Sequence, residues 1–117
     1  MIISRKCSFE AAHQLKNYDG PCSRLHGHSW KIELGVDGPV VKETGMVMDF
    51  KILKDWLNRF VVEVFDHHLI NDIIPNPTAE NIASWIAEEF CEAEFDVVLA
   101  YVRVWETENS LVEWRPE

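Results

Sequence analysis

The chain has 117 residues, of which 47% are hydrophobic and 26% charged, and it carries a net charge of −9 at pH 7. This length suits one domain with a packed core, so we expect a single domain over residues 1–117 rather than a disordered chain. An acidic chain without an apolar run of transmembrane length is expected to bind neither nucleic acid nor a membrane. Three widely separated cysteines form no disulfide framework, which predicts a soluble, cytoplasmic protein.

The positive charge is concentrated near the N-terminus. Residues 1–31 contain five basic and two acidic residues, a local charge of +3, whereas the remainder contains six basic and eighteen acidic residues, a charge of −12. A positive region on an acidic chain suggests a small anionic ligand, and Lys16 and Arg24 are candidates to hold it. The alternative, which the sequence leaves open, is that these cations pair with neighbouring acidic residues at the surface.

Two strands are predicted in the first third of the chain. Residues 2–13 alternate with a period of two, and the alternation returns over residues 26–36, where Trp30, Ile32 and Leu34 share one face. Turn-forming residues at 17–21 predict a loop between these strands.

Two helices are predicted in the middle of the chain. A short extended piece at residues 46–48 precedes Asp49, a suitable N-cap, and apolar residues then recur at helical spacing as far as Val64. Thr78 can cap a second helix, whose apolar stripe ends at Phe90. The stripe of the first helix is predicted to contain Phe50, Leu53, Leu57, Phe60, Val61 and Val64.

Two further strands are predicted at residues 97–106 and 111–115, with a turn between them. The order β-β-α-α-β-β predicts an α+β fold in which a four-stranded antiparallel sheet carries both helices on one face. The other face of the sheet would be only half covered, and self-association would bury more of it.

The five histidines lie in three short stretches, at His13, at the pair His26 and His28, and at the pair His67 and His68. His26 and His28 share a strand face, about 7 Å apart along the chain. If the first two strands pair antiparallel, His13 can supply a third imidazole, which would leave one position of a tetrahedral metal ion open. A chance His-x-His pair on a solvated strand is the alternative.

Four other residues are candidates for chemistry. Cys22 precedes His26 by four residues and is interpreted as a metal ligand, a nucleophile or base, or a buried apolar residue. The adjacent Asp66 and His67 can act as an oriented acid–base pair, although the pair can also simply end a helix. Glu106 ends an apolar strand, where a carboxylate can bind N–H groups of a ligand.

These stretches together resemble the 6-pyruvoyl-tetrahydropterin synthase / 6-carboxy-tetrahydropterin synthase family. The short Cys-x-x-x-His-Gly-His spacing is most similar to the 6-carboxy-5,6,7,8-tetrahydropterin synthases of queuosine (7-deazaguanine) biosynthesis. The matching segments run through the chain in the family's order, at residues 9–13, 22–28, 45–50 with 53–54, 65–68, 77–81 and 105–107.

The resemblance implies a tunnelling fold, or T-fold, whose subunits form a homo-oligomer, commonly a hexamer, with shared active sites. It implies Zn²⁺ bound by His13, His26 and His28. It also implies roles for residues away from the metal: catalysis by Cys22, Asp66 and His67, a pterin anchor at Glu106, and a border of the pterin site near Thr78 and Glu80.

The function implied is that of a zinc-dependent carbon–carbon lyase. Its substrate would be 7,8-dihydroneopterin triphosphate, and its products would be 6-carboxy-5,6,7,8-tetrahydropterin, acetaldehyde and triphosphate. The alternatives are a 6-pyruvoyl-tetrahydropterin synthase, which keeps every side-chain carbon, and a non-catalytic module with a closed zinc site formed by one cysteine and three histidines.

Overall fold

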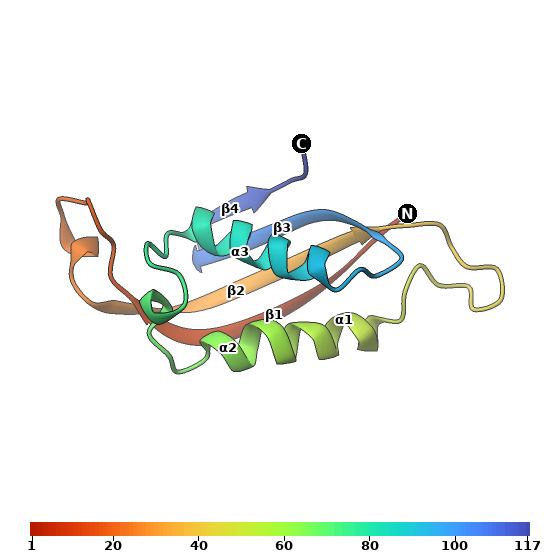
Figure 1. Cartoon of the computed structure of the whole chain (residues 1–117), viewed down its shortest axis with the longest axis horizontal. Coiled ribbons are helices and arrows are strands. Elements are labelled where there is room, and N and C mark those ends of the chain that lie inside the picture. Colours follow the sequence, from red (N-terminus) through yellow and green to blue (C-terminus); the bar gives the residue numbers. More distant parts are fainter.

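The computed structural model describes all 117 residues and contains one four-stranded antiparallel sheet (Figure 1). Its strands are β1 (Ile2–His13), β2 (His26–Asp37), β3 (Val98–Thr107) and β4 (Ser110–Trp114), and they lie side by side in the order β1-β2-β3-β4. The predicted strand boundaries are therefore correct to within about a residue, because period-two alternation is strong in each of these segments.

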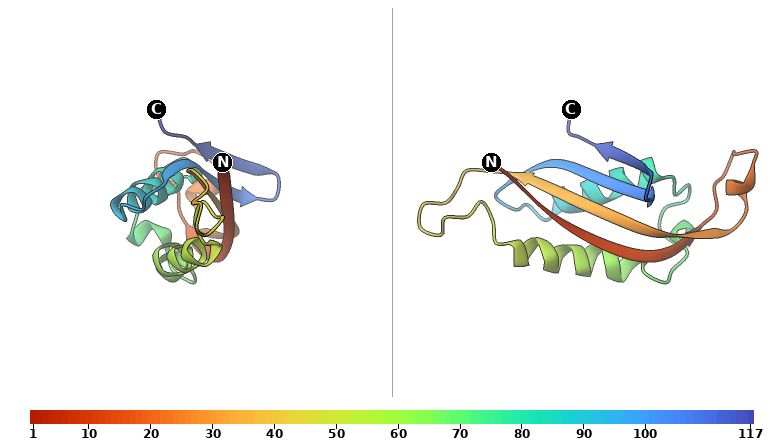
Figure 2. Two further views of the ribbon diagram at one scale, coloured as in Figure 1. Left: turned by 90° about the vertical axis from the view of Figure 1, so that its right-hand side faces the viewer. Right: turned by 180° about the vertical axis from the view of Figure 1, so that it is seen from behind.

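The helices lie between β2 and β3 in the chain and cover one face of the sheet (Figures 1 and 2). The predicted α+β class and element order are confirmed. Two short 3₁₀ turns occur in the loops. The helical segments are α1 (Phe50–Leu57), a π-helical turn (Asn58–Val62), α2 (Glu63–Phe65) and α3 (Ala79–Glu92), and the 3₁₀ turns are Pro21–Ser23 and Ile70–Asp72.

Both predicted helix caps are confirmed. The Asp49 carboxylate accepts a hydrogen bond from the backbone N–H of Lys51 at 2.9 Å, and the Thr78 hydroxyl accepts one from the N–H of Asn81 at 3.1 Å. The extended piece predicted at residues 46–48 is wrong, since only Met46 forms an isolated bridge and the following two residues bend toward the helix.

The core lies between the sheet and the helices. Trp30, Ile32 and Leu34 on β2 are fully buried, as the alternation predicts, and they pack with the apolar face of α3. The first helix departs from its predicted stripe, because Phe50 and Phe60 are exposed. The π-helical turn has a wider repeat than an α-helix, and it directs Phe60 away from the core, where its ring stacks on Trp56.

The opposite face of the sheet carries charged side chains rather than a second helical layer. The buried carboxylate of Glu33 accepts hydrogen bonds from the Tyr101 hydroxyl at 2.5 Å and from Arg103 at 2.9 Å. A buried charge needs such partners, so this network fixes β2 and β3 side by side. We call this surface, which carries Glu33, Tyr101 and Arg103, the helix-free face.

The molecule is elongated, with extents of 53 × 28 × 26 Å. The loop between β1 and β2 projects at one end, and the loop between β2 and α1 projects at the other, next to the N-terminus (Figures 1 and 2). None of the helices combines the length and the apolar character that crossing a bilayer requires. The residues with candidate chemistry lie at the end of the sheet where β1 finishes and β2 begins.

Candidate active site

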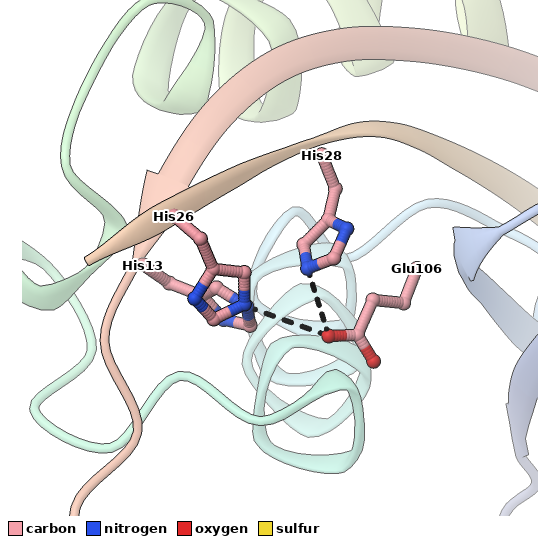
Figure 3. A group of neighbouring side chains, drawn as sticks. All are labelled: His13, His26, His28 and Glu106. Atoms are coloured by element: carbon pink, nitrogen blue, oxygen red, sulfur yellow. Dashed lines mark hydrogen bonds and ion pairs between the residues drawn. The ribbon is translucent and has the colours of Figure 1, made fainter. Parts of the chain in front are cut away.

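Three imidazoles meet at that end of the sheet (Figure 3). Antiparallel pairing places the last residue of β1, His13, opposite the first residue of β2, His26, and His28 follows on the same face of β2. The Nε2 atoms of His13 and His26 are 3.0 Å apart, and the ring centroids of His26 and His28 are 4.8 Å apart. The juxtaposition that the sequence predicts is therefore present.

Backbone carbonyls fix the tautomers of two of these rings. His13 Nδ1 lies 2.8 Å from the Pro77 carbonyl oxygen, and His26 Nδ1 lies 2.7 Å from that of Arg24. A carbonyl can only accept, so each Nδ1 carries the proton and each Nε2 presents a lone pair. Two lone pairs at 3.0 Å repel one another unless a cation lies between them. This carbonyl–imidazole arrangement is typical of metal-binding histidines.

The site favours neutral imidazoles. His13 is fully buried, and burial lowers its pKa below the ordinary value of 6.5; burial also lowers the pKa of His28. The Trp30 ring contacts both His13 and His28 edge-on, which fixes the rings from the core side. Neutral imidazole is the form that binds a metal ion.

A carboxylate completes the group. Glu106 Oε1 lies 3.1 Å from His28 Nε2 and 3.4 Å from His13 Nε2. The four ligand atoms all lie within 4.8 Å of one another, and the buried His28 Nε2 forms no hydrogen bond. A group of converging acceptor atoms, one of which is a nitrogen without a hydrogen-bond partner, fits a divalent cation. Imidazole and carboxylate ligands together suit zinc and the neighbouring first-row transition metals.

Asp66 and His67 form a hydrogen-bonded pair at the outer edge of β1. His67 Nδ1 donates to Asp66 Oδ2 at 2.8 Å, while Asp66 Oδ1 accepts the backbone N–H of Glu10 at 2.9 Å. These two hydrogen bonds, that from Glu10 first, lower the pKa of Asp66 below its ordinary value of 3.8. The ionised carboxylate holds the proton on Nδ1, so His67 Nε2 is free to accept one.

The edge strand also holds the backbone of this pair. His67 has a left-handed φ of 59°, and its N–H donates to the Glu10 carbonyl at 2.6 Å. The chain then runs parallel to β1, with a bridge between Ala12 and Leu69. A non-glycine residue in this conformation is strained, which is common at functional sites.

The structure does not bring this acid–base pair to the three imidazoles. His67 lines a cavity of about 550 Å³ together with Glu10, Gly27 and Ser29, whose positions belong to the helix-free face, and with His28 of the histidine group. The histidine group lies on the helix-covered face. The acid–base pair therefore lies outside the clustered ligand atoms, although it shares a cavity with His28.

Cys22 lies in the 3₁₀ turn of the β1–β2 loop and is half-buried. Its sulfur is not among the clustered ligand atoms, where Glu106 takes the fourth place instead. Lys16 and Arg24 are exposed in the same loop, and neither has a carboxylate within ion-pairing distance. The surface pairing considered as an alternative for these two cations is absent.

Thr78 and Glu80 lie at the start of α3, next to the histidine group. The carbonyl of the preceding residue, Pro77, is the one that His13 contacts, so the helix start borders the site. The Thr78 hydroxyl is used as the helix cap, and Glu80 is exposed. Sequence reasoning missed the role of Pro77, because a backbone carbonyl leaves no signal in the residue type.

The fold and the site define a class of protein, a two-layer α+β domain with a three-histidine centre at one end of its sheet. Residues 2–117 match the family described as 6-pyruvoyl tetrahydropterin synthase, and the chain belongs to that family. The tunnelling fold inferred from the resemblance is thereby confirmed.

Different relatives of this chain are named as different enzymes. The chain is 46% identical over 98 residues to a 6-carboxy-5,6,7,8-tetrahydropterin synthase of Synechocystis, a match covering 79% of this chain and 76% of the relative. It is 40% identical to a dihydroneopterin monophosphate aldolase of Pyrococcus furiosus, covering 95% and 94%. In fold it resembles the 6-pyruvoyl tetrahydropterin synthase of Caenorhabditis elegans, with a TM-score of 0.87, 24% identity and coverage of 100% and 96%.

Proposed function

We propose that this protein is a zinc-dependent lyase. It takes up water and converts 7,8-dihydroneopterin triphosphate to 6-carboxy-5,6,7,8-tetrahydropterin, acetaldehyde and triphosphate. The observation that carries the proposal is the convergence of His13, His26 and His28, two of them with Nε2 fixed as an acceptor, in a chain of this family. The relative named 6-carboxy-5,6,7,8-tetrahydropterin synthase supports this choice of reaction, and the queuosine pathway is its proposed setting.

The three imidazoles would hold the ion, which when bound would make substrate hydroxyl groups more acidic. Cys22 is proposed to remove a proton from a side-chain carbon. His67 would accept or donate a proton at Nε2, because Asp66 keeps the other nitrogen protonated. The pterin ring is proposed to bind Glu106, near the start of α3 at Thr78 and Glu80.

Lys16 and Arg24 are the residues proposed to bind the triphosphate. Both are exposed in the loop that connects His13, the last residue of β1, to His26, the first residue of β2, and both lack a carboxylate partner. An unpaired cation there can bind phosphate oxygens without first breaking an ion pair.

A homo-oligomer is part of the proposal, with a hexamer expected. Within one chain, the acid–base pair lies outside the cluster formed by His13, His26, His28 and Glu106. His67 is 81% exposed at its side chain, so it can serve the histidine group of a neighbouring copy. We also propose a cytoplasmic location, which the three free cysteines support.

The experiment is product analysis by mass after the zinc-loaded protein is incubated with 7,8-dihydroneopterin triphosphate. We expect 6-carboxy-5,6,7,8-tetrahydropterin together with trapped acetaldehyde. A product that retains all side-chain carbons would indicate a 6-pyruvoyl-tetrahydropterin synthase instead. A parallel reaction with the monophosphate tests the second candidate, aldolase activity, which the Pyrococcus furiosus relative favours.

The remaining alternative is a non-catalytic module with a structural zinc site. A structural site should unfold when a chelator removes the metal, whereas a catalytic site should remain folded and lose turnover. The position of Cys22 outside the ligand group argues against the closed site of one cysteine and three histidines.

A further inference from the structure

The strand β3 changes its pairing at Glu106. Its register with β2 ends at the pair Lys31–Trp105, and its register with β4 is irregular between Trp105 and Thr107. Trp105 faces the helix-free side, where Lys6 and Lys31 lie over its ring. Glu106 therefore points to the helix-covered side, into the space beyond the last β2–β3 pair. Irregular pairing next to a site commonly redirects a side chain in this way.

The redirected carboxylate faces nitrogen atoms that cannot all donate to it. His13 Nε2, 3.4 Å from Glu106 Oε1, is an acceptor because its Nδ1 proton goes to the Pro77 carbonyl. His26 Nε2 is an acceptor for the same reason and lies 3.0 Å from His13 Nε2. His28 Nε2 is 3.1 Å from the carboxylate but makes no hydrogen bond. An anion is stable among acceptors only if a cation binds them together.

Glu106 is also the member of the group that is free to move. His13 and His26 are each tied to a backbone carbonyl, and His13 is fully buried. The Glu106 side chain is 28% exposed, and its contacts within the group are the ion pairs to His13 and His28 (Figure 3). His28 packs edge-on against the buried Trp30, so the carboxylate is the one of the four side chains that a ligand can displace without breaking the supporting structure.

We infer that Glu106 is the fourth ligand of the metal ion when no substrate is bound, and that an arriving pterin draws the carboxylate away and opens the site. The second half of this inference rests on the proposed function, because it assigns Glu106 to the pterin ring in the occupied enzyme. The resting centre then holds its ion with three imidazoles and one carboxylate. The open position appears only when substrate is present to use it.

Metal affinity tests the first half without any turnover. The apoprotein is titrated with Zn²⁺ against a chromophoric chelator, for the wild type, Glu106→Gln and the control Glu108→Gln. Glu108 is an exposed carboxylate two residues along the chain, so its variant changes the net charge equally. Mutation of a residue that only supports a metal ligand typically weakens metal binding about 10- to 100-fold. We therefore expect the zinc affinity of Glu106→Gln to be at least about tenfold lower than that of the wild type.

The control should bind zinc as the wild type does. Equal affinities for wild type and Glu106→Gln, with circular dichroism showing both folded, would overturn the assignment of Glu106 as a ligand. An equal loss in Glu108→Gln would also overturn it, because the effect would then come from overall charge.

The Co²⁺-substituted protein tests the second half through its visible absorption spectrum. Adding 7,8-dihydroneopterin should change the spectrum of the wild type, and Glu106→Gln should differ from the wild type before any pterin is added. Binding of the pterin is followed by fluorescence in the same samples. A bound pterin with an unchanged wild-type cobalt spectrum would overturn the release. If no pterin binds, the proposed function and the release both fail, while the zinc titration still decides whether Glu106 is a ligand.

Discussion

The substitution Asp66→Asn should abolish most turnover while leaving the fold intact. The asparagine carbonyl oxygen can replace Asp66 Oδ1 as the acceptor for the Glu10 N–H, so the edge of β1 keeps its connection to the loop. At the other position, however, the Oδ2 atom that accepts the His67 Nδ1 proton at 2.8 Å becomes an NH₂ donor. His67 then moves its proton to Nε2, the nitrogen that must accept one.

The size of the loss follows from that change of tautomer. General acid–base catalysis contributes about 10²- to 10⁴-fold to a rate, and a wrong tautomer removes most of it, so we expect kcat to fall within that range. KM should change little, because neither residue is expected to bind the ground state. The nearby exposed Asp72 provides the control, Asp72→Asn, which should behave as the wild type.

Steady-state kinetics of Asp66→Asn, His67→Gln and the double variant provide the assay. Residues that act as one unit lose activity non-additively, so the double variant should be no slower than His67→Gln. A loss in Asp66→Asn smaller than about tenfold, with the fold intact, would refute the role of the carboxylate in orienting His67. Fully additive losses would show that the two residues act separately.

Three further predictions concern other groups of the site. Cys22→Ala should retain zinc but lose turnover, and loss of the metal, measured by elemental analysis, would make Cys22 a ligand instead. Lys16→Gln with Arg24→Gln should raise KM for the triphosphate substrate and leave the affinity for 7,8-dihydroneopterin unchanged; equal effects on both ligands would remove these cations from the triphosphate site. Since the folded-state pKa of Asp66 is lowered, its carboxylate stabilises the fold above pH 3.8 and loses this effect as the pH falls through the lower folded value. The melting temperature of Asp66→Asn should therefore be below that of the wild type at pH 6, and the difference should shrink in acid. A difference in melting temperature that does not depend on pH would contradict the lowered pKa of Asp66.

Local patterns were sufficient to predict the strands and the histidine group. The alternation over β1 and β2 defines which face each residue takes, and antiparallel pairing of consecutive strands is the common arrangement. With both features, His13 can lie beside His26, and the observed register pairs the two residues. The capping residues Asp49 and Thr78 carry equally local signals, because each uses its own side chain on the next turn.

Features that depend on long-range pairing were not predictable. The loop after α2 adds to the edge of β1, which leaves His67 outside the cluster of ligand atoms, and no local pattern indicates that choice. The carboxylate of Glu106 reaches the imidazoles because β3 leaves β2 after Trp105, a property of two strands and not of one segment. Phe60 is exposed because of a π-helical turn that the sequence does not announce.

One strand holds both halves of the proposed chemistry. The backbone of Glu10 fixes Asp66 and His67 at the edge of β1, and His13, three residues later, contributes an imidazole on the helix-covered face. Trp30 connects the core to this strand by donating its indole N–H to the Ala11 carbonyl at 3.2 Å. Such a rigid support is needed to keep catalytic groups within a fraction of an ångström of their working positions.

Zinc titration of the chelator-treated protein, followed by activity and bound metal in the same samples, tests the metal centre most directly. We predict that the apoprotein is folded and inactive, that activity returns in proportion to bound zinc up to one ion per chain, and that His13→Ala neither binds the ion tightly nor regains activity. Full turnover in the metal-free protein, or wild-type zinc binding by His13→Ala, would contradict a metal centre built from these three imidazoles.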